Sequence, residues 1–359
     1  MMIYTSLIIA IIAFFILTFL NSAVFGAEQN KEQFRNLPNF SDGVFKNESA
    51  TEFMSKDGSF LKILKEWINK PKDNKPKNII PIVKTDLINF NPGSELKMIW
   101  FGHSSYLIYI EGKKILVDPV FNIASPISIM GKPFQMSYDY SAQDFPEIDI
   151  LLITHDHYDH LDYQFFKSIL SKIKQIVTSK DVEAHLKLWG ATENQITSLN
   201  WNESSSVGNF NFICLPARHF SGRKFKRSTT LWSSFALKTE NYNLYLGGDS
   251  GFDTHFEKIG NQYGPFDLAI LECGQYGKYW PFIHMTPEET VKASKLLKAK
   301  VLMPVHWAKF ALSTHSWTEP IERAVLEAKK ENVSILTPQI GEPFGLSENQ
   351  NFSKWWRTG

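Results

Sequence analysis

The chain has 359 residues, of which 43% are apolar and 21% charged, so it is long enough for one large domain or two ordinary ones. Its 38 lysines and arginines nearly cancel 37 acidic residues, which leaves a formal net charge of +1. This balance argues against a nucleic-acid-binding protein, because such proteins usually carry a basic excess or stripe. Cys214 and Cys273 each lie in an apolar stretch without metal-finger or redox spacing. We interpret both as buried thiols, with a disulfide between them still open.

The first 26 residues are strongly apolar, and no charged side chain occurs from Met1 to Phe25. About 20 apolar residues are enough to cross a bilayer as a helix. A cleaved secretory signal usually begins with basic residues and ends in a small-x-small cleavage site, and neither feature is clear here. We therefore expect residues 1–26 to form a single uncleaved membrane anchor, which would make the protein membrane-associated. Export after signal cleavage is the alternative.

Residues 27–92 are polar and interrupted by proline, as in the stretch NKPKDNKPKN at 69–78. We interpret them as a linker and N-terminal extension with one short amphipathic helix over 60–68. The pattern changes near Leu96, where apolar strand-like runs begin. We therefore place the main folded domain at 93–345, followed by a C-terminal tail at 346–359.

Strand-like runs dominate the start of this domain, and helical segments alternate with strands later. Strands are expected at 96–102, 105–112, 113–119, 148–154, 174–179, 210–217, 233–239, 242–249, 266–273, 299–306 and 333–338. Helices are expected at 162–172, 181–189, 286–298 and 319–330. Two sheets with helices on the outside fit this order better than a simple βαβ wind.

A crowded polar motif, His-x-His-x-Asp-His at 155–160, directly follows one of these predicted strands. His155 and His157 project to the same side of an extended segment, because side chains alternate along a strand. Asp159 and His160 come where the chain must leave the strand, so they can turn toward a second point nearby. Imidazole and carboxylate groups suit zinc, and iron or manganese less strongly. The motif therefore predicts a metal site rather than an idle polar loop.

Three further polar residues follow predicted strands in the same way, namely His219, Asp249 and His306. If these strands share one sheet edge, their side chains converge near the 155–160 motif. Seven ligands are too many for one zinc ion and enough for two. Two metal ions about 4 Å apart can lower the pKa of a bridging water and take up charge developing on the attacked group. The sequence thus predicts a hydrolase with two Zn²⁺ ions, with iron or manganese as alternatives.

The order of these motifs resembles that of the metallo-β-lactamase superfamily over about Leu96 to Pro343. Blocks such as GHSSYLIYIEGKKILVDPVF, THDHYDHLD and HMTPEETV are similar to the N-acyl-phosphatidylethanolamine-hydrolysing phospholipase D group. The resemblance implies an α+β fold, an αββα sandwich of two mixed β-sheets flanked by helices, here with the N-terminal membrane segment added. It also implies a phosphodiesterase that releases phosphatidic acid and an N-acylethanolamine by means of a metal-bridging hydroxide.

The same resemblance distributes the seven candidate ligands between two metal ions. One zinc ion would be held by His155, His157 and His219. The other would be held by Asp159, His160 and His306, with Asp249 bridging the two ions.

Further roles follow from the resemblance. It implies catalytic functions for Asp159 and His284, the latter by polarising the substrate, with a structural role for His284 equally open. Asp118 would orient ligand histidines from outside the ligand set. His103 is interpreted as a scaffold or supporting residue.

Three polar residues near these motifs have no assigned role at the metals. His185 and His255 have no counterpart in the family pattern, and we expect them at the surface. Asp156 stands where the family often has asparagine and alternates away from the metals. Its purpose is not explained by the sequence.

Substrate choice rests on fewer signals. Aromatic residues near His284 and His306 could line an apolar channel for acyl chains or pack in the core. The expected partners are a phospholipid or other phosphodiester substrate and a membrane contacted through residues 1–26, with no nucleic acid, and a homodimer is compatible with the sequence. The alternative function is a lactonase or other ester or amide hydrolase on a small polar substrate. A metal-holding protein without turnover is disfavoured by the complete ligand set.

Overall fold

One of the two large sheets has seven strands in the order β15-β3-β4-β5-β6-β7-β8 in the computed structural model, which describes residues 2–27, 31–127, 129–346 and 351–358. The strands are β3 (Lys97–Trp100), β4 (Tyr106–Ile110), β5 (Lys113–Val117), β6 (Ile148–Ile153), β7 (Ile173–Ser179), β8 (Ile196–Leu199) and β15 (Pro343–Gly345). β15 to β5 pair antiparallel, whereas β5 to β8 pair parallel, so the sheet is mixed.

The second sheet has six strands in the order β14-β13-β12-β11-β10-β9. They are β9 (Ser204–Val207), β10 (Phe210–Leu215), β11 (Ser234–Lys238), β12 (Asn243–Leu246), β13 (Leu268–Glu272) and β14 (Leu302–Val305). β9 to β12 pair antiparallel and β12 to β14 parallel, so this sheet is mixed as well.

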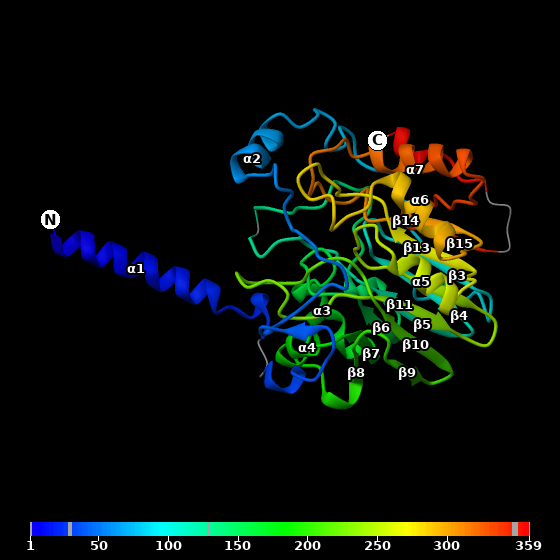
Figure 1. Cartoon of the computed structure of the whole chain (residues 1–359), viewed down its shortest axis with the longest axis horizontal. Helices are drawn as coiled ribbons and strands as arrows, with labels where there is room; N and C mark the ends of the chain where they lie inside the picture. The colour runs from blue at the N-terminus through cyan, green and yellow to red at the C-terminus, as the bar shows by residue number, and fades with distance from the viewer. Residues whose placement is uncertain (1, 28–30, 128, 347–350, 359) are drawn as a thin grey trace.

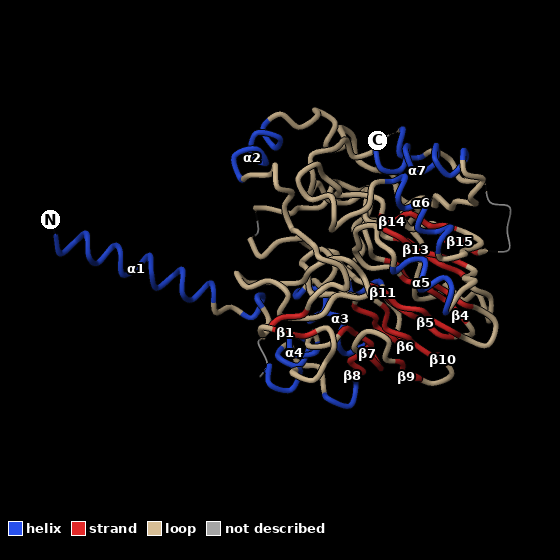
Figure 2. Tube along the Cα trace, in the orientation of Figure 1, coloured by secondary structure: helices blue, strands red, loops and turns tan. Residues whose placement is uncertain are grey.

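The two sheets face each other across the largest apolar cluster, and helices cover their outer faces (Figures 1 and 2). The first sheet is covered by α3 (Tyr163–Ile169) and α4 (Glu183–Leu188). The second is covered by α5 (His255–Gln262), α6 (Pro287–Leu296) and α7 (Glu319–Lys330). The expected αββα order of layers, with two mixed sheets, is confirmed.

Strand β6 shows how the sequence specifies this layering. Ile150 and Leu152 point into the core between the sheets, whereas Leu151 and Ile153 pack toward α3 and α4. Successive side chains of a strand face opposite sides, so the part of β6 that is buried on both faces, residues 150–153, is apolar, whereas Asp149 near its start is half-buried. The polar motif at 155–160 therefore begins where the buried strand ends at the edge of the sheet.

Several predicted elements agree closely with the structure. The helix expected over 60–68 is α2 (Phe60–Ile68), and the helix expected over 286–298 is α6. Thr286 caps α6 by accepting a hydrogen bond from Glu289 N, and Glu289 bonds back to the cap, a pairing that stabilises helix starts. Cys214 and Cys273 are buried free thiols.

The strand expected at 333–338 is wrong. Ile335 forms only an isolated parallel bridge with Leu302 beside β14. Pro338 follows closely, and proline cannot donate a backbone hydrogen bond to continue the ladder. The prediction also omitted α5, β8, β9, β15 and the small hairpin of β1 (Phe40–Ser41) and β2 (Val44–Phe45).

The stretch before the main domain contributes to the apolar core. Phe34, Phe40 and Phe45 are buried, and their ring centroids lie 5.0–5.7 Å apart. Trp355 and Trp356, near the C-terminus, are buried as well, and Trp355 packs on Trp100 and Trp307. The domain limits given above stay predictions, but both flanking stretches pack on the sandwich.

The structure does not support the membrane anchor expected at residues 1–26. α1 (Met2–Leu20) extends away from the body (Figure 1). A bilayer span requires a continuous apolar helix of about 20 residues. Within the described ranges, no helix combines the length and apolarity that a membrane crossing needs. The predicted anchor in residues 1–26, and the membrane location inferred from it, are therefore wrong.

Candidate metal centre

The candidate ligands meet at one edge of the two sheets because each follows the end of a strand. The 155–160 motif follows β6, His219 follows β10, Asp249 follows β12 and His306 follows β14. The structure brings all seven together in groups whose potential ligand atoms lie within 4.8 Å of one another. The topology thus gathers residues that are up to 151 positions apart in the sequence (155 to 306).

The first group contains His155, His157, His219 and Asp249. Nδ1 of His157 lies 3.0 Å from Nε2 of His155 and 3.2 Å from Nε2 of His219. Nitrogen ligands of a tetrahedral zinc ion, with Zn–N of about 2.0–2.1 Å, lie about 3.3 Å apart. Oδ2 of Asp249 is 3.8 Å from Nε2 of His155 and 3.6 Å from Nε2 of His219. The spacing of the three imidazoles therefore suits one metal ion.

Hydrogen bonds fix which nitrogen of these histidines faces the group. Nδ1 of His219 lies 2.7 Å from the carbonyl oxygen of Ile283, to which it must donate. Nδ1 of His155 lies 3.0 Å from Oγ1 of Thr154, which itself donates to Asp118 and so accepts from the imidazole. In both residues Nε2 is left without a proton, as a metal ligand requires.

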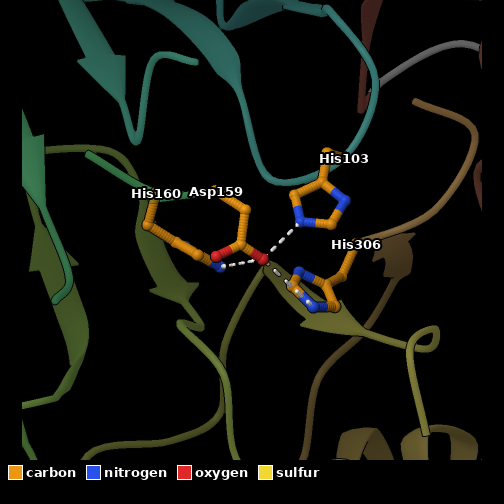
Figure 3. A group of neighbouring side chains, drawn as sticks. All are labelled: His103, Asp159, His160 and His306. Atoms are coloured by element: carbon orange, nitrogen blue, oxygen red, sulfur yellow. Dashed lines mark hydrogen bonds and ion pairs between the residues drawn. The ribbon is translucent and has the colours of Figure 1, made fainter. Parts of the chain in front are cut away.

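The second group contains His103, Asp159, His160 and His306 (Figure 3). Oδ2 of Asp159 lies 2.9 Å from Nε2 of His103, 3.9 Å from Nε2 of His160 and 4.0 Å from Nε2 of His306. His103 was expected only as a supporting residue, but its ring lies among the ligands with a centroid 4.0 Å from that of His306. The FGHSS turn between β3 and β4 was the sequence signal for it.

Asp118 orients His160 from behind. Its Oδ2 accepts a hydrogen bond of 2.7 Å from Nδ1 of His160, and the same carboxylate accepts bonds from the main chain and hydroxyl of Thr154. Nε2 of His160 is therefore directed into the group. This is the orienting role that the resemblance implied for Asp118.

Several atoms at the centre have no hydrogen-bond partner among the described residues. Nε2 of His160, Nε2 of His306 and Oδ1 of Asp249 are all buried, and none makes a well-aligned hydrogen bond, although Oδ1 of Asp249 and Nε2 of His160 lie 3.1 Å apart. Buried polar atoms nearly always have partners, because an unpaired one costs free energy. Imidazole and carboxylate donors around these atoms fit a divalent cation of the zinc, iron or manganese type.

Burial and the carboxylates set the charge state of the centre. Burial lowers the pKa of His155, His219 and His306 well below the usual range, which favours the neutral form that binds metal. Burial opposes ionisation of Asp249, but the adjacent His160 outweighs it and lowers the pKa of Asp249 to about 2. The Asp249 carboxylate is thus charged and these three imidazoles are neutral. Burial lowers the pKa of His160 as well, but Asp249, Asp118 and Asp159 outweigh it and raise that pKa well above the usual range, so a cation bound at His160 would replace a proton.

Comparison with known proteins agrees with this geometry. A sequence model of the beta-lactamase superfamily domain matches residues 113–307, more than half of the chain. The chain belongs to the metallo-β-lactamase superfamily and is a metal-dependent hydrolase. An uncharacterized protein of Mycobacterium tuberculosis is 36% identical over 326 residues, which cover 89% of this chain and 87% of that protein.

Two further comparisons concern function and fold. N-acyl-phosphatidylethanolamine-hydrolyzing phospholipase D 1 of Caenorhabditis elegans is 34% identical over 303 residues, which cover 78% of this chain and 84% of that protein. Igni18, a metallo hydrolase from Ignicoccus hospitalis, has a TM-score of 0.53 at 21% identity, over 69% of this chain and 97% of that structure. The solved structure supports the metallo-β-lactamase fold alone.

His284 stands beside the metallo-β-lactamase centre and is held by Glu272. Its Nδ1 lies 2.8 Å from Oε2 of Glu272, and its ring is stacked on that of His306 with centroids 5.2 Å apart. Burial opposes its protonation, but Glu272 outweighs this effect and raises the pKa of His284 to about 9. Together with Asp249 and His306, the pair forms a third group of potential ligand atoms. The sequence had offered no signal for Glu272.

The centre opens into a cavity of about 390 Å³. Five of the proposed ligands line it together with His284. Its apolar wall includes Phe53, Ile63 and Trp67 from the stretch before the main domain, and Trp280. Of the aromatic residues near His284 and His306, for which a channel lining and a core position were both open, Trp280 lines the cavity and Trp307 is buried in the core. The contribution of the N-terminal stretch was missed, because no local pattern shows what such a segment packs against.

Two histidines expected at the surface are buried instead. His185 is 3% exposed and His255 is 4% exposed. Nε2 of His185 donates a 3.1 Å hydrogen bond to Asp156, and Nε2 of His255 lies 3.2 Å from the hydroxyl of Ser250. The prediction was wrong because each histidine has a polar partner from a distant or looped segment, which makes burial acceptable.

The sequence did not explain the purpose of Asp156. In the structure it links the loop of the 155–160 motif to the loop that carries His219. Its Oδ1 accepts a 2.7 Å hydrogen bond from the main chain of Gly222, in the loop that carries His219. Its Oδ2 accepts the bond from His185. As expected, the side chain points away from the ligand groups, but it connects the segments that carry them.

Proposed function

We propose that the protein is a metal-dependent phosphodiesterase of the phospholipase D type that hydrolyses N-acyl-phosphatidylethanolamine-like phospholipids. The observation that carries this proposal is a two-part His/Asp centre beside a cavity with an apolar wall. A phosphodiester needs charge stabilisation at phosphorus, and its acyl chains need an apolar surface. The similarity to the Caenorhabditis elegans phospholipase D over most of both chains supports the same substrate class.

In this proposal the seven candidate ligands would hold two metal ions. One ion would be held by His155, His157 and His219, and the other by Asp159, His160 and His306. Asp249 could contribute to both sites, because its two oxygens face different groups. Two divalent ions would lower the pKa of water and take up the charge that develops at phosphorus. The ligand types favour zinc, with iron or manganese as alternatives.

The reaction forms a bond between a water oxygen and phosphorus and breaks the bond from phosphorus to the ethanolamine oxygen. His284 is proposed to hydrogen-bond a phosphoryl or leaving-group oxygen through Nε2, since Nδ1 is engaged by Glu272. Asp159 lines the same cavity and is proposed to accept a hydrogen bond from the attacking water. The proton finally resides on the N-acylethanolamine that leaves.

The apolar wall of the cavity is the reason for proposing a lipid substrate. Phe53, Ile63 and Trp67 lie at the cavity, and Trp67 and Ile63 are one helical turn apart on α2. Ligand sites typically combine an apolar lining with a few convergent polar groups. A small polar substrate, the alternative, would make little use of this wall.

The test is a substrate screen on the full chain, with metal content measured on the same sample. N-acyl-phosphatidylethanolamine in detergent micelles, bis(p-nitrophenyl) phosphate and a set of lactones are compared. We expect phosphatidic acid and N-acylethanolamine from the lipid, loss of both on chelation, and recovery with zinc. Activity on bis(p-nitrophenyl) phosphate alone would leave a phosphodiesterase and remove the lipid substrate. Activity confined to lactones would refute the proposal.

A further inference from the structure

The described residues 31–51 form a segment, here called the N-terminal strap, that crosses the loops of the metal centre. Its aromatic residues anchor it in the core, and Phe45 N donates a 2.9 Å hydrogen bond to the carbonyl of Ser228. Lys31 pairs with the buried Asp181 near its start. In Figure 1 this blue segment lies against the green part of the chain. The strap is therefore held at several points along the body.

Asn47 of the strap pairs with the main chain of His219, 172 positions away. Its Nδ2 donates a 2.8 Å hydrogen bond to the carbonyl oxygen of His219. Its Oδ1 accepts a 3.1 Å bond from the main-chain nitrogen of the same residue. Nε1 of Trp232 donates a further bond of 3.1 Å to that oxygen. One side chain thus satisfies both polar main-chain groups of a residue in the metal centre.

The hydrogen bonds from Asn47 take the place of the main-chain bonds that a neighbouring strand would make if His219 lay within a sheet. β10 ends at Leu215, so His219 lies beyond the ladder in a loop. His219 itself is 1% exposed, so its main-chain groups have little access to water. Buried main-chain groups require partners, and at this position Asn47 provides them.

The strap also holds the neighbouring residue. Nη2 of Arg218 donates to the carbonyl of Ala50 at 2.9 Å, and Nε donates to the hydroxyl of Thr51 at 3.0 Å. The main chain of Arg218 bonds in turn to Ser250 and Gly251, directly after Asp249. The strap is therefore connected to two of the loops that carry candidate ligands.

We infer that Asn47 is a positioning residue of the metal centre, which holds the His219 loop so that Nε2 faces the first ligand group. The inference rests on the ligand role proposed for His219. With the loop fixed, Nε2 of His219 lies 3.2 Å from Nδ1 of His157 and 3.6 Å from Oδ2 of Asp249. The N-terminal strap is then a working part of the centre and not a removable extension.

The test compares the full-length parent with Asn47→Ala by competition for zinc with a chromophoric chelator. Replacing groups that orient metal ligands typically lowers affinity about 10- to 100-fold. We expect a loss in this range at one site per chain, and an altered visible spectrum of the Co²⁺-loaded protein. The melting temperature of the metal-free variant is measured alongside.

Asn243→Ala is the matched control. Asn243 is partly exposed like Asn47, and its Nδ2 donates to two main-chain carbonyls, those of Tyr263 and Pro265, away from the candidate ligands. We expect it to change melting temperature but not zinc affinity. Asn47→Asp, which keeps the accepting oxygen, should recover part of the affinity and serves if Asn47→Ala does not fold.

Unchanged zinc affinity and Co²⁺ spectrum in Asn47→Ala would overturn the inference, as would an equal loss of affinity in Asn243→Ala. Both readouts are independent of substrate. If the lipid is not hydrolysed but Asn47→Ala still loses zinc, the proposed reaction fails and the positioning role stands.

Discussion

Oδ1 of Asp249 lies 3.1 Å from Nε2 of His160. The other oxygen of this carboxylate faces His155 and His219 at 3.8 and 3.6 Å. One side chain at the end of β12 thus reaches both proposed metal positions. The relationship makes Asp249 the residue on which the two-metal arrangement most depends.

Asp249→Ala should therefore affect both metal positions. We expect loss of at least one equivalent of metal and a fall in kcat of more than about 100-fold, since removing an orienting partner alone costs about 10- to 100-fold in affinity or activity. Elemental analysis and phosphodiesterase assays on the same sample check this. Glu257→Ala, an exposed acid on α5, is the control. An Asp249→Ala protein with full metal content and full rate would refute the bridging role.

Asp118→Asn tests the orientation of His160. The buried carboxylate accepts from Nδ1 of His160 at 2.7 Å and from Thr154 N at 2.8 Å and Oγ1 at 2.6 Å. The amide would present an NH₂ group to one of these donors, so we expect about 10- to 100-fold weaker zinc binding. Unfolding free energy should fall by about 1–3 kcal/mol because a buried donor loses its partner. Wild-type zinc affinity in this variant would contradict the orienting role.

Trp67→Ala tests the apolar wall. If acyl chains contact Trp67, the variant loses about 1–2 kcal/mol of apolar burial, which corresponds to roughly a tenfold rise in KM for the lipid. The KM for bis(p-nitrophenyl) phosphate should stay near the parent value. Leu61→Ala is the control, because Leu61 is on the same helix but is 75% exposed and does not line the cavity. Equal KM changes for the two substrates would argue against acyl-chain binding at this wall.

Asp156→Asn tests the link between the loops. Ala27 N donates to Nδ1 of His185 at 2.9 Å, so Nε2 must carry the proton that it donates to Asp156. An amide at 156 cannot accept from both His185 and Gly222 through its single oxygen, and we expect a loss of about 1–3 kcal/mol of stability. In a denaturation double-mutant cycle, His185→Ala should cost less in the Asp156→Asn background than alone. Additive costs would show that the two residues act independently.

The buried amine of Lys309 should make the free energy of unfolding depend on pH. It is 4% exposed, and burial lowers the pKa of its amine to about 7, against about 10.4 in an unfolded chain. Between these values the unfolded chain binds a proton that the folded chain does not, so unfolding free energy rises with pH. Lys309→Met removes this dependence. At pH 7 and below, the free energy of unfolding of Lys309→Met should exceed that of the parent by at most about 5 kcal/mol. This excess should decline as the pH rises toward 10.

Urea denaturation at pH 6.5 and pH 9.5 measures that difference. Loss of the 3.1 Å hydrogen bond from Nζ to the carbonyl of Phe101 affects both pH values alike. A difference between variant and parent that stays constant or grows with pH would contradict the prediction.

The sequence was informative where the chemistry is local. The 155–160 motif follows a strand whose last four residues are all apolar, and His219, Asp249 and His306 follow their own strands in the same way. Strand ends of a sheet lie along one edge, so the convergence of these residues followed from the strand pattern. α2 was predicted at its observed bounds because its apolar residues have helical periodicity.

The remaining features depend on contacts between segments that share no local pattern. Asn47 looks like any polar residue in a loop, and only the fold places it on His219. His185 and His255 were assigned to the surface because their partners, Asp156 and Ser250, could not be identified from the chain. His103 was undervalued for the same reason, since Asp159 reaches it only in the folded protein.

The central claim, hydrolysis of the phosphodiester bond of an N-acylated phospholipid, is tested most directly by turnover in H₂¹⁸O. The metal-loaded protein is incubated with N-acyl-phosphatidylethanolamine, and the products are analysed by mass spectrometry. Attack of water at phosphorus predicts one ¹⁸O atom in phosphatidic acid and none in the N-acylethanolamine. Label in a released fatty acid or in the N-acylethanolamine, or no phosphatidic acid from fully metal-loaded protein, would contradict the account.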